Sequence, residues 1–302
     1  MSQLLGNKTR KQHWIPQFYL RYFADSAGRL QVYRVEGDRF FATGTEGVCA
    51  ERDLYEVEYT AEDSSDSDRF YLPNFIEKKL SKMEDELAAA YVQLLDCVAK
   101  EEFGSGRFDA GRLAICSLAV NFIVRHPEVM RADLEDVSEF ALKFKNSNQF
   151  NATELAVLEE SDWRGDYSAL MKLAAQSALL FSNDEAVPRT KICRALAQKR
   201  LTVLKAPVGM RFVTTSMPLF VTGPDDDSYD FDTAYMPLSS TYAAFFSNLM
   251  TLPIYMRLDV SEVMLLNRLL LLSCPHLDLA IASARGPLEL AVRDCKLAST
   301  RN

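Results

Sequence analysis

The stretch from residue 74 to residue 124 constrains the fold most, because its apolar residues repeat with the period of a helix. From Asn74 to about residue 100 the spacing is that of an amphipathic helix with one buried face. A more apolar stretch from Phe108 to Val124 predicts a second helix, which we expect at the centre of a bundle. The apolar stripe of the first helix consists of Ile76, Leu80, Met83, Leu87, Tyr91, Leu94 and Val98.

Further helical patterns follow these two along the chain. Pro127 comes directly after Arg125-His126, and a proline disfavours helix at the residue before it. The second helix is therefore expected to end there. Further helices are predicted at about 128–145, 152–161, 166–182, 186–199 and 261–273.

Strand-like patterns lie on both sides of the helices. Turn residues around Asp25–Gly28 and Glu36–Asp38 predict a hairpin over residues 29–43. Short strands are also predicted at 201–204, 211–214, 219–221 and 242–246, whereas residues 275–295 fit either a helix or a final strand. We expect an α+β fold, in which a central helical bundle packs with one small mixed or antiparallel sheet built from N- and C-terminal strands. Residues 1–302 then form a single domain, with an N-terminal motif and hairpin at 10–60, the bundle at 74–200 and the C-terminal sheet and helix at 201–295.

Composition narrows the class of protein. Hydrophobic residues make up 48% and charged residues 25%, as in ordinary globular domains. The net charge of −8 argues against a surface that grips nucleic acid everywhere, although a small basic groove remains compatible with it. The six cysteines include no Cys-x-x-Cys pair, which favours buried, reduced thiols over a zinc ribbon. No apolar run is long enough to span a bilayer, so we expect a cytoplasmic protein with no membrane partner.

The segment Gln12–Phe23 is the least generic part of the chain. It combines His13 and Arg21 with five aromatic residues, directly after the basic residues Lys8, Arg10 and Lys11. In such surroundings the pKa of His13 could be tuned toward neutrality for acid–base catalysis. The alternative is a structural histidine that hydrogen-bonds the backbone while the aromatic rings pack.

Several charged residues are candidates for the same site. Arg21 and Arg125 could form an anion clamp, because a guanidinium matches phosphate or carboxylate, or they could instead make structural salt bridges. Glu77 and Glu84 share one helix face, and a carboxylate facing the core beside His13 would indicate function, whereas a solvated face would not.

Other polar residues favour a structural interpretation. The aspartates at 225–227, 230 and 232 lack the glycine and glutamate of a calcium loop, which favours an exposed acidic loop. His126 and His276 have no partner at zinc spacing. Whether a metal or another cofactor is used stays open, and a divalent ion is compatible with the sequence.

The opening motif His13-Trp14-Ile15-Pro16-Gln17-Phe18-Tyr19-Leu20 resembles that of a family of unknown function, DUF4238. Arg125-His126-Pro127, Phe212–Pro218, Met236–Ser240 and Asn267-Arg268 are similar to later motifs of the family. The resemblance implies that Thr215, Ser216 and Asn267 line the site. Ser216-Met217 departs from the Asp-Asn usual in the family, so a carboxylate that relatives carry is absent at this position.

Two functions from different classes follow. The first is a phosphodiester-acting hydrolase, nuclease-like and of the toxin or defence type known from small bacterial proteins. His13 would act as general base or acid, Arg21 and Arg125 would hold the phosphate, and Glu84 would orient the histidine or bind a metal. Its partner would be a nucleic acid or nucleotide. The second is a non-enzymatic binding or assembly module, a divergent inactive family member that binds a protein partner or self-associates.

Overall fold

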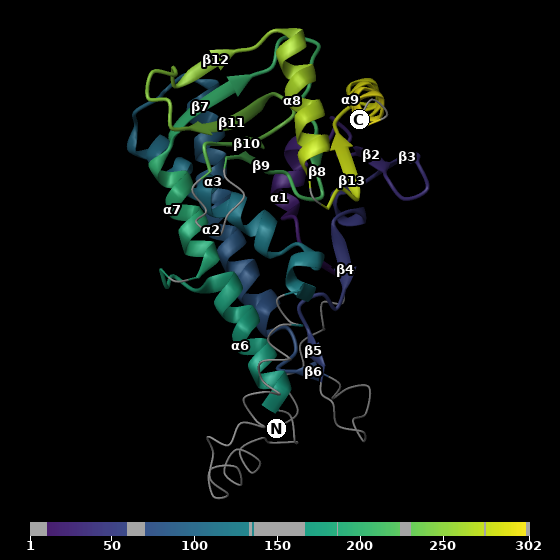
Figure 1. Cartoon of the computed structure of the whole chain (residues 1–302), viewed down its shortest axis with the longest axis vertical. Coiled ribbons are helices and arrows are strands. Elements are labelled where there is room, and N and C mark those ends of the chain that lie inside the picture. Colours follow the sequence, from purple (N-terminus) through teal and green to yellow (C-terminus); the bar gives the residue numbers. More distant parts are fainter. Residues whose placement is uncertain are drawn as a thin grey trace, which may run out of the picture.

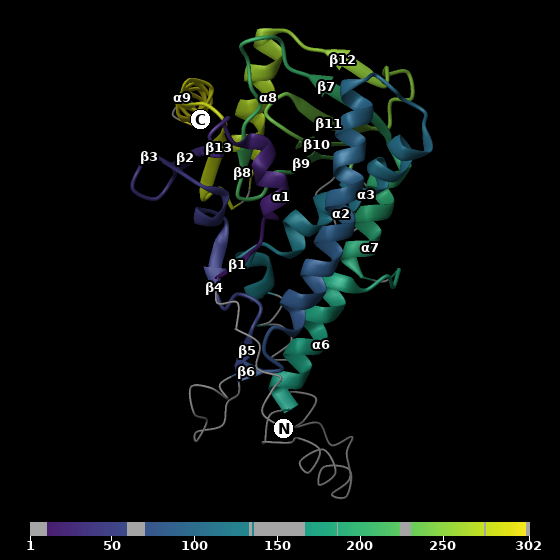
Figure 2. The same ribbon diagram turned by 180° about the vertical axis from the view of Figure 1, so that it is seen from behind.

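The computed structural model of the chain describes residues 11–58, 70–132, 135, 167–185, 187–223, 231–274 and 276–299. Long helices run down one side of the molecule, and the larger sheet lies across their upper end (Figures 1 and 2). The helices are α2 (Phe75–Ala99), α3 (Gly106–Val124), α6 (Tyr167–Phe181) and α7 (Pro188–Gln198). The predicted α+β class is therefore confirmed.

Helices α2 and α3 form the centre of the bundle. The stripe of α2 is buried at Ile76, Leu80 and Leu94, and α3 is buried over most of its length. Ser105 caps α3 by accepting a hydrogen bond from the Phe108 amide at 3.2 Å. Helix α3 ends at Val124, and a new helix begins at Pro127, as the proline predicts.

Other predicted helices also form. Helices α6 and α7 match the patterns at 166–182 and 186–199, and α8 (Val260–Ser273) matches that at 261–273. Asp259 and Glu262 start α8 with a capping box. Most of the predicted helix at 128–145, all of that at 152–161 and the acidic residues 225–227 and 230 lie outside the described residues.

The expected single sheet is instead divided into separate sheets. One has the order β12 (Tyr255–Arg257), β7 (Arg200–Lys205), β11 (Tyr242–Ser247), β10 (Thr233–Pro237) and β9 (Phe220–Thr222), with β12 parallel to β7. The other is antiparallel and has the order β3 (Arg39–Thr43), β2 (Leu30–Arg34), β13 (Leu279–Ala282) and β8 (Thr214–Thr215). This second sheet joins N- and C-terminal strands as predicted. Two short strand pairs, β1 (Lys11–His13) with β4 (Ala50–Arg52) and β5 (Val57–Glu58) with β6 (Phe70–Tyr71), complete the set in the described residues.

The strand predicted at 211–214 forms only at its end. The Phe212 amide donates to the Ser240 carbonyl at 3.0 Å, and the Val213 amide donates to the Asn267 side chain at 3.0 Å. Because a loop and a side chain satisfy these amides, the segment does not join the ladder of β7. In this part of the chain only β8 is a strand, and β8 belongs to the four-stranded sheet.

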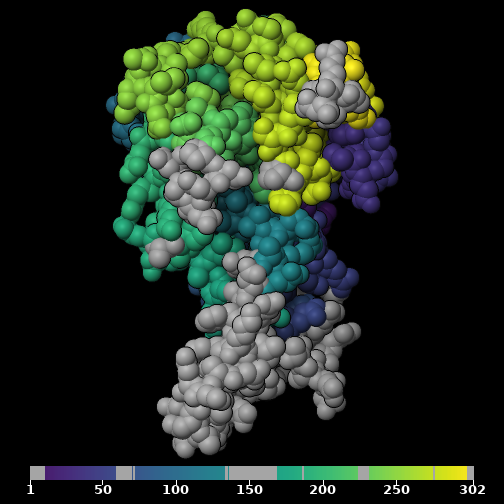
Figure 3. Space-filling model, in the orientation of Figure 1, coloured from purple at the N-terminus to yellow at the C-terminus, as the bar shows by residue number. Residues whose placement is uncertain are grey.

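Residues 275–295, for which the sequence was compatible with either a helix or a strand, contain one of each. Strand β13 pairs with β2 and β8, and helix α9 (Arg285–Ser299) follows it. An apolar core that includes Ala280, Val263 and Leu288 packs β13, α8 and α9 together. Residues from α8 and the five-stranded sheet form much of the upper surface on the face shown in Figure 3.

Candidate functional site

The aromatic N-terminal segment folds inward. Ile15, Tyr19 and Phe23 are fully buried among side chains of α2, α3 and the sheets. The Trp14 indole donates to the Ser216 carbonyl at 3.0 Å. Strand β1, α1 (Gln17–Leu20) and the short helix η1 (Arg21–Phe23) therefore turn one side to the core, and Trp14 and Tyr19 contact the turn at 214–218.

Arg125, directly after α3, is the most buried charged residue at this site. Its side chain is 2% exposed and donates to Glu84 Oε1 at 2.7 Å, to the Tyr55 hydroxyl at 3.0 Å and to the His13 carbonyl at 2.5 Å. Burial works to lower the pKa of Arg125, but Tyr55 and Glu84 outweigh it and hold this pKa above its ordinary value. The guanidinium is thus occupied by internal partners, as in the structural alternative for this residue.

Glu84 does not orient the His13 imidazole as predicted. It bonds Arg125 instead, because Arg125 emerges from α3 opposite the same face of α2. The prediction that Glu77 and Glu84 share a face is consistent with their surroundings, since Arg125 acts on the charge of both.

Glu77 differs from Glu84 in having a carboxyl oxygen that nothing satisfies. Its Oε2 is buried without a hydrogen-bond partner among the described residues. Burial raises the pKa of Glu77 to about 7, Arg125 opposes this rise, and the neighbouring carboxylates of Glu84 and Glu56 add to it. This carboxyl is therefore expected to titrate near neutral pH instead of in the acid range.

Glu56 and Gln12 connect this cluster to α2 and β1. Glu56 accepts from the Asn74 amide at 3.2 Å, at the start of α2, and from the Gln12 side chain at 2.8 Å. Gln12 also accepts from the Tyr55 amide at 2.7 Å. Glu56 thereby supplies the cap that Asn74, with its left-handed backbone, does not provide.

His13 lies on the opposite face of β1 from Gln12. Burial, followed by the charge of Lys11, lowers the pKa of His13, and a hydrogen bond to the backbone of Glu46 opposes this decrease. Nε2 is buried and has no hydrogen-bond partner in the described part of the chain. The lowered pKa favours the neutral form of the imidazole, and Nε2 is the ring nitrogen left without a partner among the described residues.

Two exposed cations lie on the same face of the strand pair as His13. Lys11 is opposite Arg52 in the antiparallel register, and both are exposed. Arg52 also bonds Asp53 at 3.3 Å. Arg21, predicted to form a clamp with Arg125, is exposed on η1, whereas Arg125 is buried.

The remaining predicted site residues are buried and bonded to the backbone. The Ser216 hydroxyl donates to the His276 carbonyl at 2.9 Å and accepts from the Asp278 amide at 3.1 Å. The Thr215 hydroxyl accepts from the Met217 amide at 3.3 Å. Asn267 bridges Val213 and Arg211 with both ends of its amide, each at 3.0 Å. These three residues hold the 211–218 segment in place.

Sequence reasoning missed a histidine pair behind Trp14. His126 and His276 stack with ring centroids 5.1 Å apart, and His126 Nε2 lies 3.9 Å from an Asp278 oxygen. Burial, and then His276, lower the pKa of His126 to about 4. Asp278 contacts Ser216 through its backbone amide. The two histidines are far apart in sequence, so no local spacing could reveal them.

The six cysteines are free, and burial raises the pKa of five of them, namely Cys49, Cys116, Cys193, Cys274 and Cys295. Within the described ranges no group of three or more His, Cys, Asp or Glu side chains is arranged to hold a metal ion.

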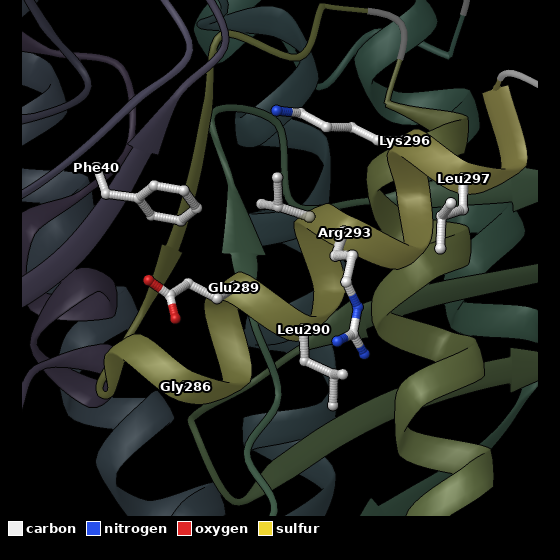
Figure 4. Close-up of a pocket in the computed structure, with 8 residues that line it drawn as sticks. Phe40, Gly286, Glu289, Leu290, Arg293, Lys296 and Leu297 are labelled. Atoms are coloured by element: carbon white, nitrogen blue, oxygen red, sulfur yellow. The ribbon is translucent and has the colours of Figure 1, made fainter.

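A surface hollow of about 590 Å³ lies elsewhere, beside α9. Figure 4 shows Phe40 across from α9, with its ring directed toward that helix, which carries both Glu289 and Lys296. The Arg285 guanidinium stacks on Phe40 at 4.4 Å from the ring centre, and Lys296 bonds Asp38 at 2.6 Å. None of the predicted site residues lines this hollow.

Comparisons with known proteins give one match. A family model described as a protein of unknown function (DUF4238) matches residues 11–274. No curated protein and no solved structure matches the chain. Among the helices that the structure describes, none has the length and apolar character needed to cross a bilayer.

Proposed function

The chain belongs to DUF4238, a family of proteins of unknown function, and from that premise we propose that it is a hydrolase acting on a phosphodiester, with His13 as general base. The observation that carries this proposal is the state of the imidazole. Nε2 is left without a partner among the described residues, on a ring whose pKa is lowered by burial and by the charge of Lys11. A general base requires an imidazole that favours its neutral form and has a ring nitrogen not already engaged in a hydrogen bond.

The step that His13 would perform is a proton transfer. Nε2 takes a proton from water as the water oxygen attacks phosphorus, and the bond from phosphorus to the leaving oxygen breaks. The imidazolium then returns a proton to that leaving oxygen, which regenerates neutral His13. No metal is needed for this balance, and a divalent ion bound by the substrate would add charge stabilisation.

Support for an anionic substrate comes from the cations beside His13. Lys11 and Arg52 are exposed on the same face of the β1–β4 pair, and Arg21 is exposed on η1. Such side chains can contact phosphate oxygens without first leaving an internal partner of the strength that holds Arg125. We therefore assign phosphate binding to Lys11 and Arg52 in place of Arg125.

The test is an assay of the full chain with bis(p-nitrophenyl) phosphate and with single- and double-stranded DNA and RNA, each with Mg²⁺, with Mn²⁺ and with EDTA. His13→Ala should reduce kcat by about 100-fold or more, with a change in Tm of about 2 °C or less. Lys11→Ala/Arg52→Ala should raise KM, whereas Arg39→Ala, an exposed arginine on β3, should not. Turnover that survives His13→Ala unchanged would refute the assignment.

A binding or assembly module is the second candidate, and a specific observation favours it. Nε2 of His13 is buried, and the polar groups of Ser216 and Asn267 are bonded to backbone. If the chain is such a module, we expect no turnover on any of these substrates and a large decrease of Tm in His13→Ala. We also expect the molecular mass measured by sedimentation to depend on protein concentration.

A further inference from the structure

The main-chain oxygen of His13 is held by two side chains. The Tyr55 hydroxyl donates to it at 2.9 Å and Arg125 Nη2 donates at 2.5 Å. Both residues are 2% exposed. The strand that carries the imidazole is therefore fixed from the side of the helices by bonds to its backbone.

The two donors are also bonded to each other and to α2. Arg125 Nε donates to the Tyr55 hydroxyl at 3.0 Å, and Nη1 donates to Glu84 at 2.7 Å. The planar guanidinium makes these three bonds at once, which the single ammonium of a lysine cannot reproduce in the same geometry. Glu84, Arg125 and Tyr55 thus form a continuous connection from α2 and the end of α3 to the backbone of His13.

We propose that Arg125 and Tyr55 are positioning residues for His13: by fixing its carbonyl they hold the imidazole in one place and keep Nε2 in its present setting. The inference deepens the proposed hydrolase and rests on it for its catalytic meaning. The positioning itself can be measured without turnover. The charge of Arg125 also contributes to the lowered pKa of His13, which is consistent with their proximity.

The experiment compares Tyr55→Phe with the unmodified chain by the rate at which diethyl pyrocarbonate acylates each histidine, followed by peptide mass spectrometry. The chain has three histidines, so His126 and His276 serve as internal references. Loss of the hydroxyl should increase the acylation rate of His13 about fivefold, which corresponds to the net free energy of one hydrogen bond. The acylation rate of His276 should stay unchanged. Tyr33→Phe is the matched control, because the Tyr33 hydroxyl bonds Asp38 on the β2–β3 hairpin.

Arg125→Lys provides a second test, because it keeps the positive charge but loses the planar guanidinium that makes three hydrogen bonds. It should also accelerate acylation of His13, and in a chain that turns over substrate both variants should lower kcat with little change in KM. Equal acylation rates of His13 in the intact chain and in Tyr55→Phe would overturn the positioning role. An intact chain without turnover would contradict the hydrolase alone, since the acylation rates are measured independently.

Discussion

At the scale of single residues, two glutamates on the same helix face have different fates. Glu84 bonds Arg125, whereas Glu77 Oε2 is buried and has no partner among the described residues. The shared face follows from local spacing along the chain. The partner of Glu84 cannot be deduced from local spacing, because Arg125 lies at the end of another helix.

Glu77→Gln should stabilise the protein above neutral pH. The folded-state pKa is raised to about 7 from the ordinary 4.5, so folding favours the protonated carboxyl. Its contribution is complete below pH 4.5 and is lost as the pH rises through about 7. We expect the amide to add about 1 kcal/mol at pH 8, after discounting for solvent screening of this half-buried group. Urea unfolding at pH 8 and pH 4.5 measures it.

Glu86→Gln is the matched control, since Glu86 is exposed on the same helix. The difference in free energy of unfolding between Glu86→Gln and the unmodified chain should be about the same at the two pH values. A variant at Glu77 that is equally stable as the unmodified chain at pH 8 would show that its carboxyl titrates normally.

At the scale of secondary-structure elements, the approach of α2 and α3 depends on a glycine. A Cβ at Gly111 would lie 2.5 Å from the Leu94 Cβ and 3.2 Å from the Ala90 carbonyl oxygen. At this point the backbone of α3 therefore packs directly against the Leu94 side chain of α2.

Gly111→Ala should destabilise the protein by about 1 to 3 kcal/mol, because the added methyl forces the two helices apart. Gly106→Ala, at the start of the same helix, meets no atom within 4 Å. It should stabilise by about 0.5 kcal/mol through a less flexible unfolded chain. Thermal unfolding of the two variants tests the contrast, and a neutral or stabilising Gly111→Ala would contradict it.

The helices could be predicted from sequence because their periodicity is local. The strands could be predicted less well from the sequence. Phe212 and Val213 read as a strand, yet Ser240 and Asn267 take their amides. Likewise, Lys11–His13 is a strand only because residues 50–52 pair with it. The candidate site shows the same limit: the sequence nominates His13 and Arg125 as candidates, whereas the contact of Arg125 with the His13 carbonyl depends on tertiary structure.

At the scale of the whole molecule, one hydroxyl joins the two larger sheets. Tyr19 bonds Thr214 of β8 at 2.8 Å and the Pro237 carbonyl of β10 at 2.9 Å. These strands belong to different sheets, and Tyr19 itself packs on Phe122 of α3 with ring centres 4.7 Å apart. The N-terminal segment therefore connects the sheets to the bundle.

Tyr19→Phe should lower the free energy of unfolding by about 1 to 3 kcal/mol, since it leaves a buried carbonyl without its donor. The ring still fills its place, so a single cooperative transition should persist. Tyr33→Phe, at a hydroxyl that bonds a more exposed carboxylate, should cost less. Denaturant unfolding followed by fluorescence and circular dichroism measures both, and separate transitions for helices and sheets would contradict the connecting role.

The inward fold of the N-terminal segment has a consequence for biosynthesis. Trp14 and Tyr19 meet partners 202, 195 and 218 positions further along the chain. During translation these aromatic side chains leave the ribosome long before their acceptors exist. They must wait, exposed or chaperone-bound, until the segment around residue 237 has emerged, so the native state of this protein forms late in synthesis or after release.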